Sequence, residues 1–520
     1  MKKLKYLILM LFIIPTVVLA EPIHLTQAAI EECFANEGVY NETYKMTFKL
    51  EYAISGFFLY GDEYIIDEDL SLHKAHFGAE NNTVVVNLDG HTISSLLDKY
   101  SPVPGYLSVA PPVACGADGC DMTFNGPGKI DPSETGFSNA VLNENGKITF
   151  NNLEIVGNIK AADYSTNVDL GNEYVLNNVN LSGRFEIWNS KITINGGRFN
   201  YLAEYSENQI IGSTAIIKNA TLGTLRSNGI YINDDTGSQY SSGKKSDVLI
   251  DNCNITGGTA VISYGSTGNL LIENSELWAN GTLGAGYYGL SLYTSDPHIQ
   301  MADVHIHTDR TDWPYPTITG SSSVSMSEEE YFNALVKPGY IYWKDPVFEK
   351  QDYEATQYTE AYTSFRLTNT DIWIIKQQEE YEAEEQTYEI PEDNEVIIKV
   401  SGYKFLFEKL IINDQEVPDT DYEILDTDGD KDVSIKIKND YLKTLEANKY
   451  DIEVVFTNGS ATTTLNVVDE EPVSNEVPEV KGEVENPKTG LFNYMILLLP
   501  LAIVGIVYIV ISKKTYFKGM

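Results

Sequence analysis

Cysteine and histidine are scarce in this sequence, whose 520 residues include four cysteines and seven histidines. So few cysteines exclude a scaffold held together mainly by disulfides, and no second Cys or His pair stands near Cys115 and Cys120 to complete a four-ligand zinc site. These two residues lie close enough in ACGADGC to form a small loop disulfide in an oxidising compartment. Cys253 falls at an inward position of its strand-like segment and is predicted to be a buried thiol.

Basic residues are also few, because 36 lysines and arginines stand against 75 aspartates and glutamates and leave a net charge of −39. A nucleic-acid partner is therefore excluded, since phosphate binding needs a basic stripe. An acidic surface can hold Ca²⁺, although a solvated acidic face is the simpler interpretation. The run from Asp426 to Asp432 imitates a calcium loop, but its glycine is fourth instead of sixth and its twelfth position is Ile437. We predict a hairpin turn there and no cofactor, with weak Ca²⁺ binding as the alternative.

Long apolar runs are confined to the two ends of the chain. Residues 1–20 combine three lysines, an apolar stretch and a small-residue ending, which indicates a cleavable signal peptide. Near the other end, a tether rich in Pro and Glu (469–485) is followed by an apolar run (491–511) long enough to span a bilayer. The basic tail after it (512–520) should stay cytoplasmic, which leaves everything before the span outside the cell.

Between the tether and the apolar run lies the pentapeptide Asn486-Pro487-Lys488-Thr489-Gly490 (486–490). This pentapeptide, the hydrophobic span and the basic tail together resemble a sortase sorting signal of Gram-positive bacteria. The resemblance implies that a sortase thiolate attacks the Thr489 carbonyl, releases Gly490 onward and passes Thr489 to an amine of the cell-wall peptide. Asn486 departs from the usual leucine, which leaves the sortase class open. Without a sortase, the span would remain a plain transmembrane anchor.

Short strand-like segments rich in Asn and Gly recur between residues 84 and 310, at irregular intervals of roughly 17 to 33 residues. In VLIDNCNI and LLIENSEL apolar and polar residues alternate, which indicates strands rather than helices. Units this small cannot bury a face alone and must stack on one another. Asn and Gly at equivalent places suit left-handed corners, where stacked Asn side chains can form hydrogen-bonded ladders.

This pattern, together with the segment NLDGHTI (Asn87 to Ile93), resembles the right-handed parallel β-helix of the pectin-lyase-like family. The resemblance covers about 250 residues and implies the fold. It does not imply one function, because lyases, hydrolases, adhesins and phage spikes all use this fold.

The segments that flank the repeats are predicted to cap the open ends of the stack, which would otherwise expose strand edges. Residues 21–83 form the N-terminal capping region, with helical character over 25–35. Residues 311–375 form the C-terminal cap, in which Ser327 followed by Glu330 is a capping-box pattern that predicts a helix start.

Beyond the caps, an acidic linker (376–394) leads into closely spaced strand-like runs over residues 395–468. This segment resembles the immunoglobulin-like modules of bacterial polysaccharide-degrading enzymes. The predicted fold class is therefore all-β: a right-handed parallel β-helix (84–310), a small immunoglobulin-like β-sandwich and a C-terminal transmembrane helix.

Polysaccharide-active enzymes of this fold need two or more acids, or acids beside an Arg or Lys, on a common groove. The nearest constellation is Arg226, Asp234, Asp235 and His305. The hydrolase pattern also requires an Asn-Thr-Asp-like triplet, a Gly-His-Gly and an Arg-Ile-Lys, and the last two motifs do not occur. Asp234 and Asp235 precede a polar stretch, which favours a solvated turn over a catalytic pair. His305 and His307 share one strand face with no third ligand near them, which argues against a metal site.

Aromatic residues permit sugar binding, because indole and phenol faces pack against sugar rings. The chain has 34 tyrosines, and four tryptophans lie along or just after the repeats: Trp188, Trp278, Trp313 and Trp343. We therefore predict a surface-anchored adhesin or glycan-contacting protein without catalysis. The alternatives are a wall-tethered polysaccharide lyase or glycoside hydrolase, and a structural surface spacer. The predicted partners are a sortase with the cell-wall peptide, extracellular polysaccharide or host glycan, and the membrane through residues 491–511.

Overall fold

The computed structural model divides the chain into two compact units. The first comprises the chain up to Tyr381 together with Phe456–Ser460, and the second comprises Glu382–Val455 and the residues from Ala461 onward. The residues that the structure describes are 21–50, 55–73, 75–95, 111–115, 119–132, 139–143, 145–161, 172–200, 207–224, 227–234, 243–264, 268–279, 289–293, 299–308, 318–322, 327–343, 348–353, 362–367, 371–390, 395–425 and 432–469.

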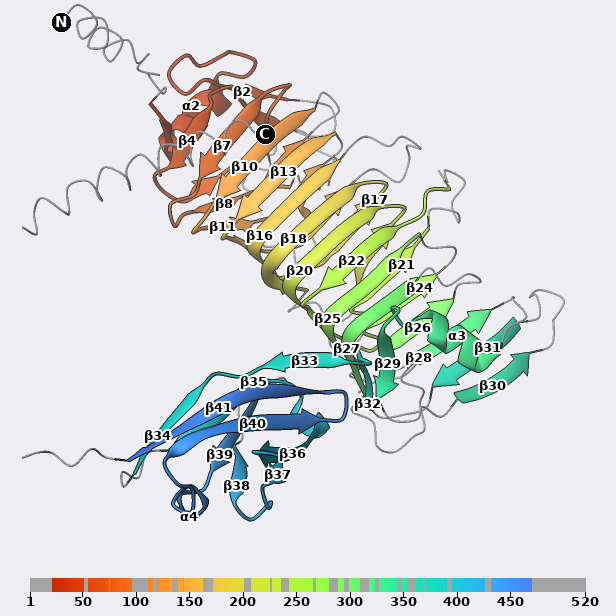
Figure 1. The fold of residues 1–520 in the computed structure, drawn as a ribbon. Coiled ribbons are helices and arrows are strands. Elements are labelled where there is room, and N and C mark those ends of the chain that lie inside the picture. Colours follow the sequence, from red (N-terminus) through yellow and green to blue (C-terminus); the bar gives the residue numbers. More distant parts are fainter. Residues whose placement is uncertain are drawn as a thin grey trace, which may run out of the picture. The chain divides into compact units, whose positions relative to one another are not determined.

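Two long sheets of mainly parallel strands build the first unit (Figure 1). In its described part, the larger sheet contains β1 (Ile23–Leu25), β4 (Glu63–Ile66), β5 (Leu70–Ser71), β7 (Thr83–Asn87), β8 (Thr92–Ser94), β10 (Cys120–Asn125), β11 (Lys129–Asp131), β13 (Gly146–Asn151), β14 (Glu154–Ile155), β16 (Glu173–Leu181), β18 (Lys191–Phe199), β20 (Thr214–Gly223), β22 (Asp247–Asp251), β23 (Asn254–Gly257), β25 (Leu270–Ala279), β27 (Ile299–Thr308), β29 (Tyr340–Trp343) and β32 (Asp371–Lys376).

The strands of the second sheet come from the same part of the chain and alternate in sequence with those of the larger sheet. It contains β2 (Met46–Lys49), β3 (Gly56–Leu59), β6 (His76–Gly78), β9 (Val113–Cys115), β12 (Asn139–Asn143), β15 (Asn158–Ala161), β17 (Phe185–Trp188), β19 (Asn208–Ile211), β21 (Ile230–Asn233), β24 (Val261–Tyr264), β26 (Leu290–Tyr293), β28 (Ile318–Ser322), β31 (Tyr362–Leu367) and β30 (Phe348–Tyr353).

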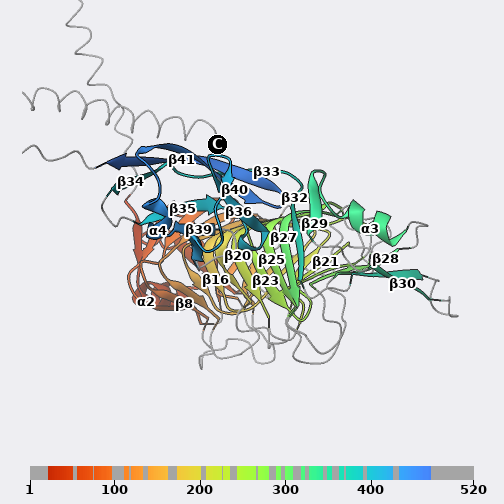
Figure 2. The same cartoon turned by 60° about the horizontal axis from the view of Figure 1, so that its bottom comes forward.

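Each turn of the chain adds one rung to both sheets, so the strands follow one another in sequence order along the stack (Figures 1 and 2). The register is parallel from rung to rung; Phe124 of β10, for example, lies beside Phe150 of β13, and Phe150 lies beside Leu176 of β16. Alternate residues of each strand point inward and form one continuous apolar core. The all-β architecture with long parallel stacks is consistent with the predicted parallel β-helix.

The predicted asparagine ladders are confirmed. At the ends of four successive strands, Asn125 donates to Asn87 (2.8 Å), Asn151 donates to Asn125 (2.9 Å) and Asn177 donates to Asn151 (2.8 Å). The residue that follows in several rungs is an asparagine with a left-handed backbone, which turns the chain between two strand segments. These corner residues, with φ between 48° and 55°, are Asn152, Asn178, Asn219, Asn252 and Asn274.

Both ends of the stack carry elements that differ from the parallel rungs. Helix α2 (Gln27–Ala35), within the predicted helical segment, packs Ala29, Ile30 and Cys33 onto the apolar core at the N-terminal end (Figure 2). Parallel pairing already begins with β1 and β4, ahead of residue 84, because the apolar residues of these short strands continue the inward rows. At the other end, β29, β30, β31 and β32 pair antiparallel.

Helix α3 (Glu328–Ala334) begins where the sequence predicts it. The Ser327 side chain accepts from the Glu330 backbone N–H (3.2 Å), and the Glu330 carboxylate accepts from the Ser327 backbone N–H (2.8 Å). These two bonds form the predicted capping box, and they place Tyr331 and Phe332 in the apolar core.

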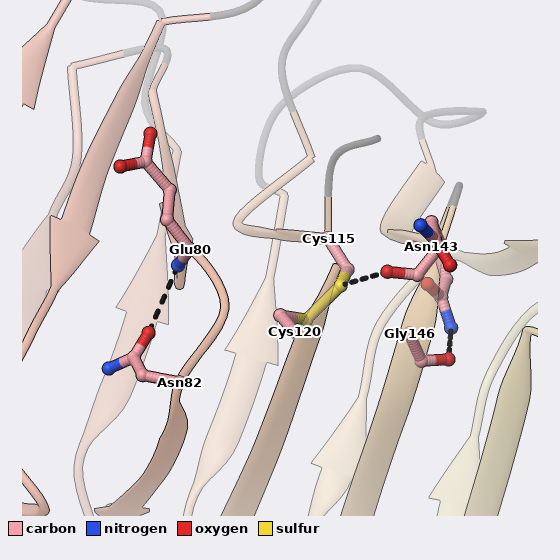
Figure 3. The surroundings of a disulfide bond; sticks show 7 residues. Glu80, Asn82, Cys115, Cys120, Asn143 and Gly146 are labelled. Atoms are coloured by element: carbon pink, nitrogen blue, oxygen red, sulfur yellow. Dashed lines mark hydrogen bonds between the residues drawn. A yellow bond between two sulfur atoms is a disulfide. The ribbon is translucent and has the colours of Figure 1, made fainter. Parts of the chain in front are cut away.

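The predicted disulfide joins Cys115 at the end of β9 to Cys120 at the start of β10 (Figure 3). The next rung passes so close that a Cβ at Gly146 would overlap the Cys115 sulfur and the Cys120 carbonyl. The Asn143 side-chain amide donates to the Gly146 carbonyl (2.8 Å) and holds that rung in place. Cys33 and Cys253 are free and buried, as predicted for Cys253.

Two smaller sheets lie mainly in the second unit. One contains β33 (Glu379–Glu382), β34 (Gln386–Ile390), β36 (Phe407–Ile412), β37 (Gln415–Glu416), β40 (Asn448–Phe456) and β41 (Gly459–Asp469), and the other contains β35 (Val396–Ser401), β38 (Tyr422–Leu425) and β39 (Asp432–Ile437). A 3-10 turn (Lys404–Leu406) and helix α4 (Asn439–Leu442) complete it. Every strand-like run predicted over 395–468 forms a strand, and much of the acidic segment 376–394 is also strand rather than open linker.

Candidate functional site

Of the catalytic candidates of the alternative function, the two that the structure describes lie on different sheets. Asp234 follows β21 of the second sheet, whereas His305 lies in β27 of the larger sheet. Arg226 and Asp235 lie outside the described residues. The interpretation of Asp234 as part of a solvated turn is wrong, because only 4% of this residue is exposed. Polar residues around it suggested exposure, but Asp234 continues the alternation of β21, in which Ile230 and Ile232 are buried and the residues between them form the outer face.

Tyr231 and Asn233 project from that outer face, because their neighbours Ile230 and Ile232 are fully buried in the core. The Tyr231 ring lies against that of Tyr264, which belongs to the next rung, with 5.4 Å between the ring centroids. The Asn233 side-chain amide donates to the Tyr231 hydroxyl (3.1 Å). Because β21 and β24 pair side by side and Tyr231 contacts both Asn233 and Tyr264, amide and aromatic groups form one continuous surface.

A carboxylate, Glu207, lies beside this pair just before β19. Its oxygens accept hydrogen bonds from the side chains of Asn228, Ser227 (3.5 Å) and Gln209 (3.3 Å). All four residues are partly buried. The group is therefore a fixed acceptor surrounded by donors, the kind of polar set that orients hydroxyl groups of a ligand.

The electrostatic surroundings make Tyr231 a hydrogen-bond donor rather than a base. Burial raises the pKa of the Tyr231 phenol, and the negative charges of Glu207 and Asp234 raise it further, while the bond from Asn233 opposes the shift. A phenol with a raised pKa keeps its proton at neutral pH. Proton abstraction from a substrate would need the opposite shift.

Charged residues continue this surface toward the N-terminal rungs. Glu186 of β17 lies beside Gln209 of β19, which lies beside Tyr231 of β21. Glu186 is only 7% exposed and forms an ion pair with Arg184. We call the set Glu186, Glu207, Gln209, Asn228, Tyr231, Asn233 and Tyr264 the tyrosine face.

Several members of the tyrosine face were missed at the sequence level. The alternation in Ile230–Asn233 could have marked Tyr231 as outward-facing, but nothing in the sequence brings Glu207 and Asn228 to it.

One hydrolase-type triplet, Asn-Thr-Asp, occurs at residues 369–371. Of this triplet the structure describes Asp371, which lies in the antiparallel strand β32.

The histidine pair lies on one face of β27, as predicted, because the intervening Ile306 is fully buried. Among the described residues, no group of three or more His, Cys, Asp or Glu side chains is arranged to hold a metal ion. The calcium-like residues 426–431 fall outside the described ranges.

The sorting signal Asn486-Pro487-Lys488-Thr489-Gly490, the signal peptide 1–20 and the apolar run 491–511 likewise lie outside the described residues. Within the described part of the chain, the helices are too short or too polar to cross a bilayer.

Comparison with protein-family models finds no match, and comparison with curated proteins finds no significant match. Among solved structures, a crystal structure of a tandem segment of titin is similar to part of the chain, with a TM-score of 0.17 and 12% sequence identity. The match covers 34% of this chain and 63% of that one, so the chain spans less than two thirds of the titin segment. A TM-score of this size supports no argument about fold or function.

Proposed function

We propose that the chain is an exported, surface-anchored protein that contacts glycans as an adhesin, without catalysis of its own. In this proposal a right-handed parallel β-helix presents the binding surface, and the second unit is an immunoglobulin-like module. The second unit's antiparallel strands and buried apolar rows fit such a module. The export signal and the sorting signal of the sequence support display on the cell surface.

The observation that carries the proposal is the tyrosine face. Tyr231 and Tyr264 offer aromatic surface, while Glu207, Asn228 and Asn233 offer a fixed acceptor and amide groups within the same rungs. Sugar recognition needs this combination of flat apolar surface and directed hydrogen bonds. A Tyr231 phenol that keeps its proton favours binding over catalysis.

The alternative function is a wall-tethered polysaccharide lyase or glycoside hydrolase. The observation that favours it is Asp234, a buried carboxylate close enough to Tyr231 to raise the pKa of that phenol. Glu207 acts on the same phenol, so the two carboxylates could serve as the pair of acids that general acid–base catalysis uses. A structural spacer, the remaining alternative, would need neither group.

The test is retention of the soluble fragment 21–485 on immobilised plant and host polysaccharides, measured together with release of reducing or unsaturated ends. We expect retention without product, and at least about a tenfold loss of affinity in Tyr231→Ala, which corresponds to about 1.4 kcal/mol. Tyr40→Ala, at an exposed tyrosine near the N-terminal end, is the matched control and should bind normally. Product that disappears in Asp234→Asn would establish the depolymerase instead, and no retention at all would leave the spacer.

Display at the surface has its own test in the native host. We expect the wild-type chain to be released from cell walls only by a wall hydrolase, and to end at Thr489 by mass spectrometry. The variant Thr489→Ala should stay in the membrane fraction with its C-terminal segment intact, because the carbonyl at the cleavage position is no longer recognised. A wild-type chain extractable by detergent alone would show that 491–511 serves as a plain anchor.

A further inference from the structure

A second aromatic surface lies on the larger sheet, near the C-terminal end of the stack. Its members, Trp278, His305, His307, Trp343 and Trp373, come from β25, β27, β29 and β32, and we call them the tryptophan row. They face away from the core, because residues that alternate with them, Leu277, Ile306 and Ile372, are buried.

The row is continuous across the strands. Glu276 lies beside His305, His305 lies beside Trp373, and Trp373 lies beside Trp343. With Asn254 of β23 next to Glu276, the row crosses five strands, which at the inter-strand spacing is on the order of 19 Å. A surface of this length could contact a chain of several sugar units rather than one ring.

Ring contacts fix the row in one arrangement. His305 stacks on Trp373 with 3.5 Å between centroids and 8° between planes, and His307 lies edge-on to Trp278 at 4.1 Å. Trp373 follows His305 by about 70 residues, and β32 brings it back antiparallel onto β27, whereas Trp278 and His307 come from the neighbouring parallel strands β25 and β27. Trp278, Trp343 and Trp373 remain only partly buried in this packing.

The exposed carboxylate of Glu276 places a negative charge on the row beside Trp278. The Trp278 indole N–H donates to Glu276 (3.2 Å), and the Asn254 side-chain amide donates to the same oxygen (3.4 Å). A fixed negative charge beside the indole repels an anionic ligand, and the net charge of −39 on the whole chain adds to that repulsion. The remaining lone pairs of the carboxylate can accept hydrogen bonds from sugar hydroxyls.

We propose that the tryptophan row, with Glu276 and Asn254, is a second glycan-binding site that selects neutral pyranose chains over uronate polymers. The inference rests on the proposed glycan-contacting function but concerns a different sheet from the tyrosine face. Pyranose rings would pack on the partly exposed indoles, and Glu276 would accept their hydroxyl protons. The Glu276 carboxylate disfavours uronates, because the negative charge of a uronate would lie beside it without a positive partner.

The experiment uses the full-length chain in a detergent without a sugar headgroup, at pH 7.5. Cellohexaose and chitohexaose are the neutral probes, hexagalacturonate is the anionic probe, and affinity is measured by calorimetry with quenching of tryptophan fluorescence as a second readout. We expect a neutral probe to bind at least tenfold more tightly than hexagalacturonate. Trp278→Ala should lose at least tenfold in affinity for the neutral probe, whereas Trp278→Phe should retain most of it.

Glu276→Gln separates recognition from packing. Glutamine can still accept from the indole N–H, so we expect neutral binding within about threefold of wild type and a severalfold gain for hexagalacturonate. The change in preference between the neutral and anionic probes in Glu276→Gln tests the proposal even where Trp278→Ala fails to fold. The proposal is overturned if neither neutral probe binds, or if Glu276→Gln leaves the preference between the probes unchanged. Loss of binding in Tyr231→Ala with no effect of Trp278→Ala would overturn it while leaving the proposed function in place.

Discussion

Lowering the pH from 7 to 5 should destabilise the first rungs of the stack by about 2 kcal/mol through His76 alone. Burial lowers the pKa of this imidazole to about 4, and a hydrogen bond to the Ser55 backbone opposes the shift. The unfolded chain takes up a proton near the ordinary value of 6.5, whereas the folded chain stays neutral there. The stability is therefore fully present above about pH 6.5 and is lost progressively as the pH falls toward 4.

The packing around His76 explains why protonation is costly. The residue is 5% exposed, and its ring lies edge-on to Phe58 with 5.7 Å between centroids. Two glycines let the backbone approach the ring: a Cβ at Gly56, which pairs with His76 from the neighbouring strand β3, would lie 2.6 Å from the imidazole, and one at Gly78, in the same strand as His76, would lie 3.2 Å from it. A charged ring in this buried position would therefore be poorly solvated.

The measurement is native-state hydrogen exchange of β3 and β6 at pH 7 and pH 5, corrected for intrinsic exchange rates. His76→Gln is the matched variant, because it keeps a polar side chain but cannot gain a charge. Its protection should change with pH by about 2 kcal/mol less than that of the wild type, whatever its absolute stability. An imidazole that titrates near 6 by nuclear magnetic resonance, or equal pH slopes in the two chains, would contradict this account.

The repeat architecture could be predicted because its signals are local. Alternation in segments such as VLIDNCNI marks strands, and an asparagine at the same place in successive units marks a left-handed corner. The capping box at Ser327 and the disulfide between Cys115 and Cys120 are equally local, since each involves residues a few positions apart. In both cases the short spacing along the chain is enough to predict which two residues are in contact.

The candidate sites depend on contacts that no local pattern contains. Glu207 meets Asn228 because two rungs stack, and the number of residues between rungs varies too much to align them from sequence. Trp373 reaches His305 only because the chain reverses direction after the last parallel rung. Stacking order and chain reversal are properties of the whole fold, so the sequence alone does not bring these side chains together.

Phe150→Ala should cost about 3–5 kcal/mol in the free energy of unfolding, the largest effect we expect from a single substitution in the stack. Phe150 is fully buried in β13, and its ring stacks on that of Phe124 with 5.4 Å between centroids and 25° between planes. Removing one ring leaves a cavity inside a column of side chains that are fixed by the rung spacing. The neighbouring rungs cannot move together to fill it, because their backbone hydrogen bonds hold that spacing.

Two variants on the same strand make this interpretation testable by urea unfolding. Phe150→Leu keeps most of the volume and should lose clearly less stability than Phe150→Ala, while Thr149→Ala, whose side chain points away from the core, should stay within about 0.5 kcal/mol of wild type. A cost below about 1 kcal/mol for Phe150→Ala would mean that the rungs can relax toward one another. Packing in the apolar column would then not fix the positions of the rungs. The asparagine ladder beside it would have to hold their register instead.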